Sequence, residues 1–429
     1  MIKKFLENPS FGDRKKDSFI WNMGGGLLSA FQSVIYLVFV SRILGLEESG
    51  ILSIAFANAN LFANIGRYGV RNFQVTDTEN RYSFSEYMGL RVLTSIIMVI
   101  TFTIYLLYTG ITRDYTTEKL VIILALCLSK LLDSFEDVYY GYLQNIDRLD
   151  IGAKILTLRL LVVYISFVLI LVFNKDLIIA ITGSTILSAL VVIISLRSIK
   201  QDGFCPSWSF SLINKENIKQ ILKSCFPLFL GTFLAFYIGN APKYAIDSLM
   251  DEETQACFAF ISMPVFVINL LNSFVFQPIL NKLAVEWNTK KYKEFIHNFI
   301  LENIIILVIT VVVVIGGKLI GIWALEIIYN TPLKIYENEF IYLLVGGGFL
   351  AYSGFYVSIL TVMRKQKITI YAYMIVSILA YIGSPILVNN YNTLGASLLY
   401  FSLMGILAVA CLVPIIIEIK NVENNYKKI

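Results

Sequence analysis

Residues 297–317 read HNFILENIIILVITVVVVIGG, a mainly aliphatic run with one acidic residue and one histidine. Because an α-helix rises about 1.5 Å per residue, a run of this length can cross the ~30 Å hydrocarbon core of a bilayer. The rest of the chain has the same character: 57% of its 429 residues are hydrophobic and 15% are charged, and its mean hydropathy is +0.71. A soluble domain is roughly 45–50% apolar and ~25% charged. The composition therefore excludes a soluble enzyme, a nucleic-acid binder and a disordered scaffold, and it predicts an integral membrane protein.

Apolar runs of similar length recur along the whole chain. They fall into two sets of six, at 18–40, 50–66, 87–108, 119–141, 155–173 and 177–196, and then at 223–246, 256–278, 297–317, 339–360, 368–388 and 395–417. A helix satisfies its own backbone hydrogen bonds inside lipid. We therefore predict an all-α membrane protein with twelve transmembrane helices.

Lysine and arginine are distributed unequally between the connections. With the N-terminus placed inside, 24 of the 35 basic residues lie in inside segments, five lie in outside connections and six lie within the runs. Cytoplasmic connections are enriched in basic residues, so both termini are expected in the cytoplasm. The first run is longer than the ~7–15-residue apolar region of a signal peptide, and we expect it to be retained as a helix.

The longest inside connection follows the sixth run. It predicts a cytoplasmic linker at residues 200–222, between an N-terminal six-helix lobe (1–199) and a C-terminal six-helix lobe with a short cytoplasmic tail (223–429). A weak internal repeat supports this division, since GLEES at 45–49 aligns with MDEET at 250–254. Parallel repeats with the site between the halves are a recurrent plan of transporters.

Residues suited to metal binding or catalysis are scarce. The chain has a single histidine, His297, and five cysteines, none of them in a C-x-x-C pair. This excludes a zinc cluster and a histidine-based catalytic triad, and no glycine-rich phosphate loop follows a strand. We expect no catalytic residue, no metal and no cofactor. The net charge of +5 does not indicate a nucleic-acid partner.

The fourth run carries the densest line of polar side chains, which includes Lys130, Asp133 and Asp137 on one helical face. A charged side chain at mid-bilayer costs ~2.5–3.5 kcal/mol on insertion scales, so these groups should face a cavity or a partner. Two interpretations remain open. Lys130 and Asp133, spaced i,i+3, can form a structural ion pair. Alternatively, Lys130 binds substrate in a cavity while Asp133 and Asp137 couple transport to H⁺ or Na⁺.

The second run ends at the cytoplasmic side with Arg67 and Arg71. These arginines either anchor the helix by the positive-inside rule or form a cationic mouth for an anionic head group. Amide side chains on several runs either line the same cavity or hold helices together. The candidates for a polar lining are Asn22, Asn60, Asn64, Asn240, Asn269 and Gln277.

Two further cations lie deeper in the runs. Arg159 is about five residues into the fifth run, and Lys243 is near the outer end of the seventh, directly after Pro242. Proline removes a backbone donor, and a disturbed helix end is tolerated only beside a cavity or protein. We interpret both cations as substrate-binding. For Lys243 the alternatives are an ion pair with Asp247 at i+4, or snorkelling to the interface.

Five short motifs resemble a known superfamily. They are FPLFLG at 226–231, GNAPKY at 239–244, GVRNFQVTD at 69–77, GYLQ at 141–144 and LGASL at 394–398. In order and position, over nearly the whole chain, they resemble the polysaccharide and O-antigen repeat-unit flippase branch of the multidrug/oligosaccharidyl-lipid/polysaccharide (MOP) superfamily. The resemblance implies a V-shaped, MATE-like fold of two six-helix lobes around a cationic cavity.

The resemblance also implies a function. Members of this branch move undecaprenyl-pyrophosphate-linked oligosaccharides from the inner to the outer leaflet of the bacterial cytoplasmic membrane, for capsule, O-antigen or teichoic-type polymers. The implied partners are this carrier lipid, membrane lipid and H⁺ or Na⁺, and the implied mechanism is alternating access. The family's charged positions correspond here to Arg67, Arg71, Lys130, Asp133 and Lys243. Lipid II flippases usually have fourteen spans, so twelve runs favour the polysaccharide branch.

Two alternative functions remain. A cation-coupled multidrug exporter has the same fold but usually an acidic cavity. A membrane polymerase or glycosyltransferase would carry a large outer loop, whereas the longest outer connection here is about 318–338. The cations favour an anionic cargo, because they balance or exceed the acidic residues of the runs: Arg67, Arg71, Lys130, Arg159 and Lys243 against Asp133, Asp137 and Glu302.

Overall fold

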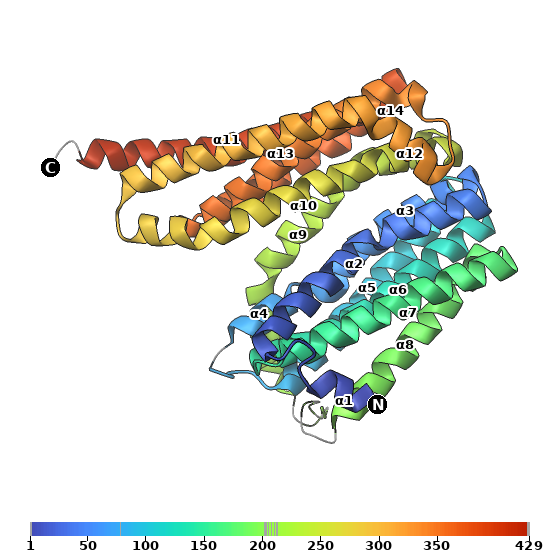
Figure 1. Cartoon of the computed structure of the whole chain (residues 1–429), viewed down its shortest axis with the longest axis horizontal. Coiled ribbons are helices and arrows are strands. Elements are labelled where there is room, and N and C mark those ends of the chain that lie inside the picture. Colours follow the sequence, from blue (N-terminus) through green and yellow to red (C-terminus); the bar gives the residue numbers. More distant parts are fainter. Residues whose placement is uncertain are drawn as a thin grey trace. The chain divides into compact units, whose positions relative to one another are not determined.

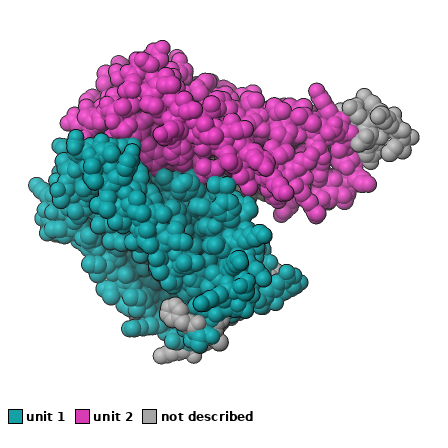
Figure 2. Space-filling view, turned by 180° about the vertical axis from the view of Figure 1, so that it is seen from behind, with its two compact units in different colours: residues 1–233 teal, residues 234–429 magenta. Residues whose placement is uncertain are grey.

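The computed structural model describes residues 2–77, 79–200, 204, 206, 208–209, 211 and 213–426 of the chain. All regular secondary structure in this part of the chain is helical (Figure 1), as predicted. The chain divides into two compact units, Met1–Phe233 and Leu234–Ile429, which are coloured separately in Figure 2. The division falls within helix α9 (Lys215–Leu249). The linker predicted at 200–222 lies partly outside the described residues.

The first unit is a bundle of long helices with two short helices at its edges. Before α9 it contains α1 (Ile2–Glu7), α2 (Arg14–Ile43), α3 (Leu46–Arg67), α4 (Val70–Thr76), α5 (Phe84–Thr112), α6 (Thr117–Asn145), α7 (Leu149–Asn174) and α8 (Leu177–Lys200). Helix α6 packs against α3, α4, α5, α7 and α8. Its charged side chains are therefore placed where neighbouring helices can supply partners.

A tight reversal separates α3 from α4. Tyr68 and Gly69 both adopt left-handed backbone conformations, with φ of 49° and 68°. A Cβ atom on Gly69 would lie 3.0 Å from the Cβ atom of Leu228 in α9. Glycine fits this position because it accepts a positive φ without steric cost and leaves room for α9. The glycine that opens the GVRNFQVTD motif therefore has a structural explanation.

The second unit is built around α13 (Glu337–Val362), which packs against α10 (Glu252–Asn288), α11 (Tyr292–Gly316) and α14 (Gln366–Tyr426). A short π-helix, η2 (Gly317–Gly321), and helix α12 (Ile322–Tyr329) continue α11, and the 3-10 helix η3 (Lys334–Tyr336) precedes α13. The prediction of an outer connection over 318–338 was therefore wrong for most of that stretch. Its apolar sequence LIGIWALEIIY prolongs the helix, and Gly321 leaves room for the ring of Phe340.

Among the described residues, nine helical segments are long and apolar enough to cross a membrane. Helices α3 and α6 are of similar length but fall outside this set. Asparagines lower the hydropathy of α3, and charged side chains interrupt α6. Helix α14 covers the last two predicted runs and breaks at Asn392, whose φ of 51° and ψ of −132° are not helical.

Large apolar side chains are exposed on the outer faces of both units. They include Ile111, Phe173, Leu319, Ile335 and Tyr381. Exposed apolar surface on this scale would be unfavourable in water, but it suits helices that face lipid. The prediction of an all-helical membrane protein is confirmed at this level.

Candidate functional site

The charged residues of α6 form the centre of an ion-pair cluster within the first unit. The carboxylate of Asp133 lies 3.1 Å from Lys130 Nζ and 2.7 Å from a terminal nitrogen of Arg159 in α7. A third cation, Arg67 at the end of α3, approaches it at 3.7 Å. Lys130 also donates a hydrogen bond of 2.8 Å to Gln32 in α2. Asp133 thus joins side chains from four helices.

The side of the cluster nearest α7 is deeply buried. Glu136 forms an ion pair with Arg159 Nε at 3.1 Å. It also accepts a hydrogen bond of 2.7 Å from the Tyr140 hydroxyl. Arg159 also donates to Ser188 of α8 at 3.4 Å. The side chain of Glu136 is 2% exposed and that of Arg159 is 8% exposed. A charge buried this deeply must be paired, and this pairing accounts for both groups.

Asp137, one turn further along α6, holds a second group of arginines. Arg91 of α5 lies 3.0 Å from its carboxylate and Arg71 of α4 lies 3.5 Å away. Arg71 also donates to Gln144 at 3.2 Å. Asp137 therefore links α4, α5 and α6 at the end of α3.

Arg91 connects this group to the end of α3. It donates a hydrogen bond of 2.5 Å to the carbonyl oxygen of Gly66, and the Thr94 hydroxyl donates to the same oxygen at 2.8 Å. The last carbonyls of a helix lack intrahelical partners, and a cation there is favoured by the helix dipole. The buried guanidinium of Arg91 thus fixes where α3 ends.

The cluster contains more positive than negative groups, and its positive groups differ in access. Five cations (Arg67, Arg71, Arg91, Lys130 and Arg159) surround three carboxylates (Asp133, Glu136 and Asp137). The side chains of Arg67 and Arg71 are 47% and 29% exposed, whereas that of Lys130 is 8% exposed. The net positive charge is therefore carried where another molecule can reach it.

The structure brings together most of the charged residues that the sequence singled out. Arg67, Arg71, Lys130, Arg159, Asp133 and Asp137 all lie in this one cluster. The i,i+3 ion pair between Lys130 and Asp133 forms, as one of the two interpretations expected. The carboxylates of Asp133 and Asp137 also contact arginines from other helices, so the pair between Lys130 and Asp133 is part of a larger network.

Lys243 lies in the second unit, away from this cluster in the sequence and in a different helix, α9. It is half-buried. Among the described residues, Lys243 forms no ion pair, either with Asp247 or with another carboxylate. It thus remains a separate candidate for contact with an anion.

The amide lining stays a prediction, because the structure describes only part of the set. Asn22 is exposed, and Asn64 and Asn240 each donate to the carbonyl four residues earlier in their own helix, to Asn60 at 2.8 Å and to Phe236 at 3.0 Å. The side chains of Asn269 and Gln277 lie outside the described residues.

Sequence reasoning missed two members of the cluster. The two are Glu136 and Arg91, neither of which was singled out from the sequence as a candidate. Each contacts a partner on another helix, and the wheel of one helix gives no information about its neighbour. The signal that was available is the presence of an ionisable residue inside an apolar run, which indicates a partner or a cavity.

The described residues contain no group of three or more His, Cys, Asp or Glu side chains placed to hold a metal ion. Four of the cysteines, Cys127, Cys225, Cys257 and Cys411, are buried in the described chain as free thiols. Buried free cysteines of this kind behave as small apolar residues.

Comparison with protein families gives one match. A family model described as "Polysaccharide biosynthesis protein" matches residues 16–284, which is more than half of the chain. No curated protein matches the chain in sequence.

Solved structures give several matches in fold. The lipid II flippase MurJ in an inward closed conformation is 15% identical, with 94% of this chain and 90% of that chain covered and a TM-score of 0.72. An inward-facing multidrug resistance MATE family transporter of the MOP superfamily is 14% identical, with 92% and 96% covered and a TM-score of 0.66.

A further match is a MOP superfamily transporter from Pyrococcus furiosus, described as having a binding pocket of reversed polarity. It is 12% identical, with 98% of each chain covered and a TM-score of 0.54. The chain therefore has the MATE-like fold that its motifs predicted, and the resemblance to the MOP superfamily is confirmed.

Proposed function

We propose a function from one premise, that this chain belongs to the polysaccharide biosynthesis protein family. It is a multi-pass membrane protein, and its neighbours in fold are transporters and flippases. We propose that it is a flippase for undecaprenyl-pyrophosphate-linked oligosaccharides, which it moves from the inner to the outer leaflet of the bacterial cytoplasmic membrane. The products would be capsule, O-antigen or teichoic-type polymers, and the proposed mechanism is alternating access through a cationic cavity.

The observation that carries this proposal is the accessible positive charge of the cluster around Asp133 and Asp137. A pyrophosphate head group cannot enter hydrocarbon with its charge unpaired. Arg67 and Arg71 are partly exposed and each lies 3.5 Å or more from its carboxylate partner. One charge pair at 4 Å is worth about 4 kcal/mol at an effective dielectric of ~20. Two such arginines can therefore replace part of the hydration of the head group.

We assign different roles to the inner and outer cations. Arg67 and Arg71 contact the pyrophosphate, because their guanidinium groups are accessible. Lys130 and Arg159 are held by Asp133 and are nearly enclosed. They hold the carboxylate of Asp133 in place and in its charged form. We therefore propose that they affect cargo binding indirectly, through Asp133. Lys243 is proposed as a second contact for the anionic cargo.

The proposal includes a topology. If α3 and α6 cross the membrane and α14 crosses twice, with its break at Asn392 outside, the chain has twelve crossings and both ends lie in the cytoplasm. The inside-negative membrane potential then favours outward movement of a net negative charge by ~2.3 kcal/mol per charge per 100 mV.

The similarity in fold to a lipid II flippase supports a lipid-linked cargo for this chain. The fold of MATE family transporters is equally compatible with drug export. The excess of cations over carboxylates in the cluster favours the anionic cargo.

The test is a translocation assay with the full chain in vesicles that contain a fluorescent undecaprenyl-pyrophosphate oligosaccharide, scored by accessibility to an added glycosidase. Arg67→Ala and Arg71→Ala should each abolish most translocation at unchanged protein level, because each removes an accessible contact to pyrophosphate. The matched control is Arg81→Ala, since Arg81 is exposed, lies outside the cluster and pairs with the nearby Glu79. Wild-type rates in both cluster variants would contradict the proposal. Efflux of a cationic dye by the wild type that is lost in Asp133→Asn, together with no oligosaccharide translocation by the wild type, would indicate a drug exporter instead.

A further inference from the structure

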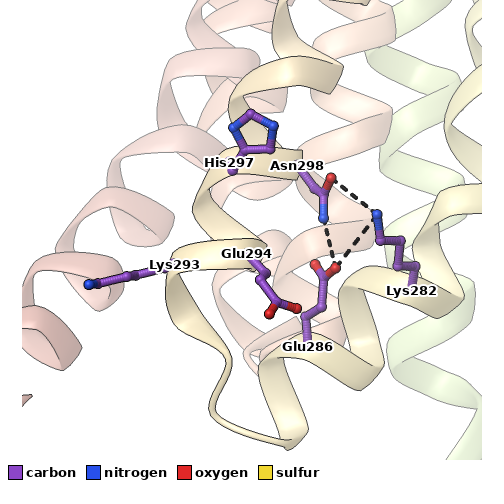
Figure 3. A pocket seen from close by; sticks show the side chains of 6 residues that line it. All are labelled: Lys282, Glu286, Lys293, Glu294, His297 and Asn298. Atoms are coloured by element: carbon purple, nitrogen blue, oxygen red, sulfur yellow. Dashed lines mark hydrogen bonds and ion pairs between the residues drawn. The ribbon is translucent and has the colours of Figure 1, made fainter.

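The second unit contains a polar pocket at the connection between α10 and α11. This cavity of about 400 Å³ is lined by Lys282, Glu286, Lys293, Glu294, His297 and Asn298 (Figure 3). Asn298 donates a hydrogen bond of 2.7 Å to Glu286, and Lys282 donates one of 3.3 Å to Asn298. The figure shows Lys282, Glu286 and Asn298 pointing toward one another and Lys293 pointing away.

The pocket leads to a face of α11 that is polar over three turns. Glu294, Asn298 and Glu302 are spaced four residues apart and therefore share one side of the helix. Glu294 is exposed, Asn298 is 7% exposed and Glu302 is 3% exposed. The series thus runs from the rim of the pocket into the interior of the unit.

Glu302 is an enclosed acidic group without a partner among the described residues. Among the described residues, neither an ion pair nor a hydrogen bond reaches it, and its Oε2 atom is fully enclosed. It lies five residues into the apolar run 297–317, about 7.5 Å along the helix axis, and so within the predicted membrane crossing. An enclosed carboxylate without a cation is strongly disfavoured, so this carboxyl is suited to take up a proton.

The described ionisable groups on the packed helices form no ion pair with Glu302 and have other partners. On α10, Lys282 and Glu286 interact with Asn298, one turn before Glu302. On α13, the hydroxyls of Tyr352 and Tyr356 donate to Asn303 at 2.8 and 2.6 Å. On α14, Glu418 is paired with Lys365. In the part of the chain that the structure describes, these groups have other partners and none is paired with Glu302.

The carboxylates of the first unit are less suited to this task. Asp133 lies within 4 Å of three cations, and Asp137 within 4 Å of two. A proton on either would have to displace those pairs.

We propose that Glu302 is a proton-binding site of this protein, that it exchanges protons with the cytoplasmic side through the pocket at Glu286 and Asn298, and that proton movement there is coupled to transport. The coupling part rests on the proposed function, whereas the binding of a proton does not. The two parts are therefore tested separately.

Proton binding is tested by labelling the purified full chain with dicyclohexylcarbodiimide, which reacts with protonated carboxyl groups in apolar surroundings. Peptide mass spectrometry should find label on Glu302 at low pH and progressively less as the pH rises. Asp133 serves as the internal control and should remain unlabelled, because its carboxylate is held by three cations. Absence of label on Glu302 at every pH, or equal labelling at all pH values, would overturn the proposal.

Coupling is tested in the translocation assay with the membrane potential clamped and a pH gradient imposed. The gradient should raise the wild-type rate, by up to about tenfold per pH unit for one coupled proton. Glu302→Gln, which keeps the size but cannot titrate, should keep the rate without a gradient and lose the response. Glu253→Gln is the control, because Glu253 is an exposed acidic residue of the same unit outside the pocket, and it should respond like the wild type. A normal response in Glu302→Gln would overturn the coupling. If wild-type protein translocates nothing, the proposed function fails and the labelling alone decides on the proton site.

Discussion

Arg67 and Arg159 contact the same carboxylate, that of Asp133, but Arg67 is partly exposed and Arg159 is buried. Arg159 lies 2.7 Å from Asp133, is almost enclosed and also holds Glu136, whereas Arg67 lies 3.7 Å away and its side chain is 47% exposed. Removing one partner of a buried pair leaves an uncompensated charge, while an exposed pair contributes little. The two arginines should therefore differ in what their loss does to the fold.

Arg159→Met should destabilise the protein by about 3–5 kcal/mol, because Asp133 and Glu136 would be left without their buried partner. Arg67→Met should cost under about 1 kcal/mol and yet lose translocation. Denaturant unfolding in detergent, followed by intrinsic fluorescence, measures the first effect, and the vesicle assay measures the second. Equal loss of stability in both variants would contradict the assignment of Arg67 to cargo binding.

The sequence could predict part of this cluster. The pair between Lys130 and Asp133 was accessible because both residues lie on one helix at i,i+3. The partners of Glu136 and Asp137 lie on other helices, and which faces meet depends on packing that one sequence does not display. The amides of Asn64 and Asn240 each donate to a carbonyl of their own helix, and their expected place along a cavity stays a prediction.

At the scale of elements, the segment between helices α1 and α2 is held against α7 by an ion pair and its hydrogen bonds. Asp17 in α2 and Lys154 in α7 form a fully buried pair of 2.6 Å. Asp17 also accepts hydrogen bonds from the backbone of Ser10 and Phe11, and Lys154 donates to the carbonyl of Asn8 at 2.8 Å. One ion pair therefore holds the segment between α1 and α2.

Asp17→Asn should release that segment, since it weakens the backbone contacts and leaves Lys154 buried without a counter-ion. Limited trypsin digestion should then cleave the exposed site at Arg14–Lys16 faster than in the wild type, while the transmembrane bundle stays intact. Asp13→Asn is the control, because Asp13 is exposed and makes only a 3.4 Å capping contact to Lys15. Unchanged cleavage of Asp17→Asn would show that the pair does not hold the segment.

Element boundaries show where sequence reasoning ends. Long apolar runs predict helices well because a membrane helix has to be apolar for about twenty residues. The continuation of α11 through η2 and α12 was missed because the sequence does not show that Gly317 and Gly321 allow close contact with the ring of Phe340. Hydropathy reports burial in lipid, and it does not report how closely two helices approach.

At the scale of the whole molecule, the twelve-crossing topology makes a direct prediction. In a cysteine-free background, Thr116→Cys and Asn392→Cys should react with an impermeant maleimide added to intact cells. Asn80→Cys and Lys290→Cys should react only after permeabilisation, since the positive-inside distribution puts their connections in the cytoplasm. External labelling at Lys290, or protection of Asn392 from outside, would contradict this topology and the count of two crossings in α14.

The charges of α6 also bear on how the chain enters the membrane during synthesis. Lys130, Asp133, Glu136 and Asp137 would each oppose insertion of an isolated helix, by ~2.5–3.5 kcal/mol for lysine or aspartate at its centre. Their partners are distributed over helices made before and after α6: Arg67, Arg71 and Arg91 precede it, and Arg159 follows it. We therefore expect α6 to insert stably only together with the helices that carry these arginines. The helices of the first unit should accordingly fold cooperatively.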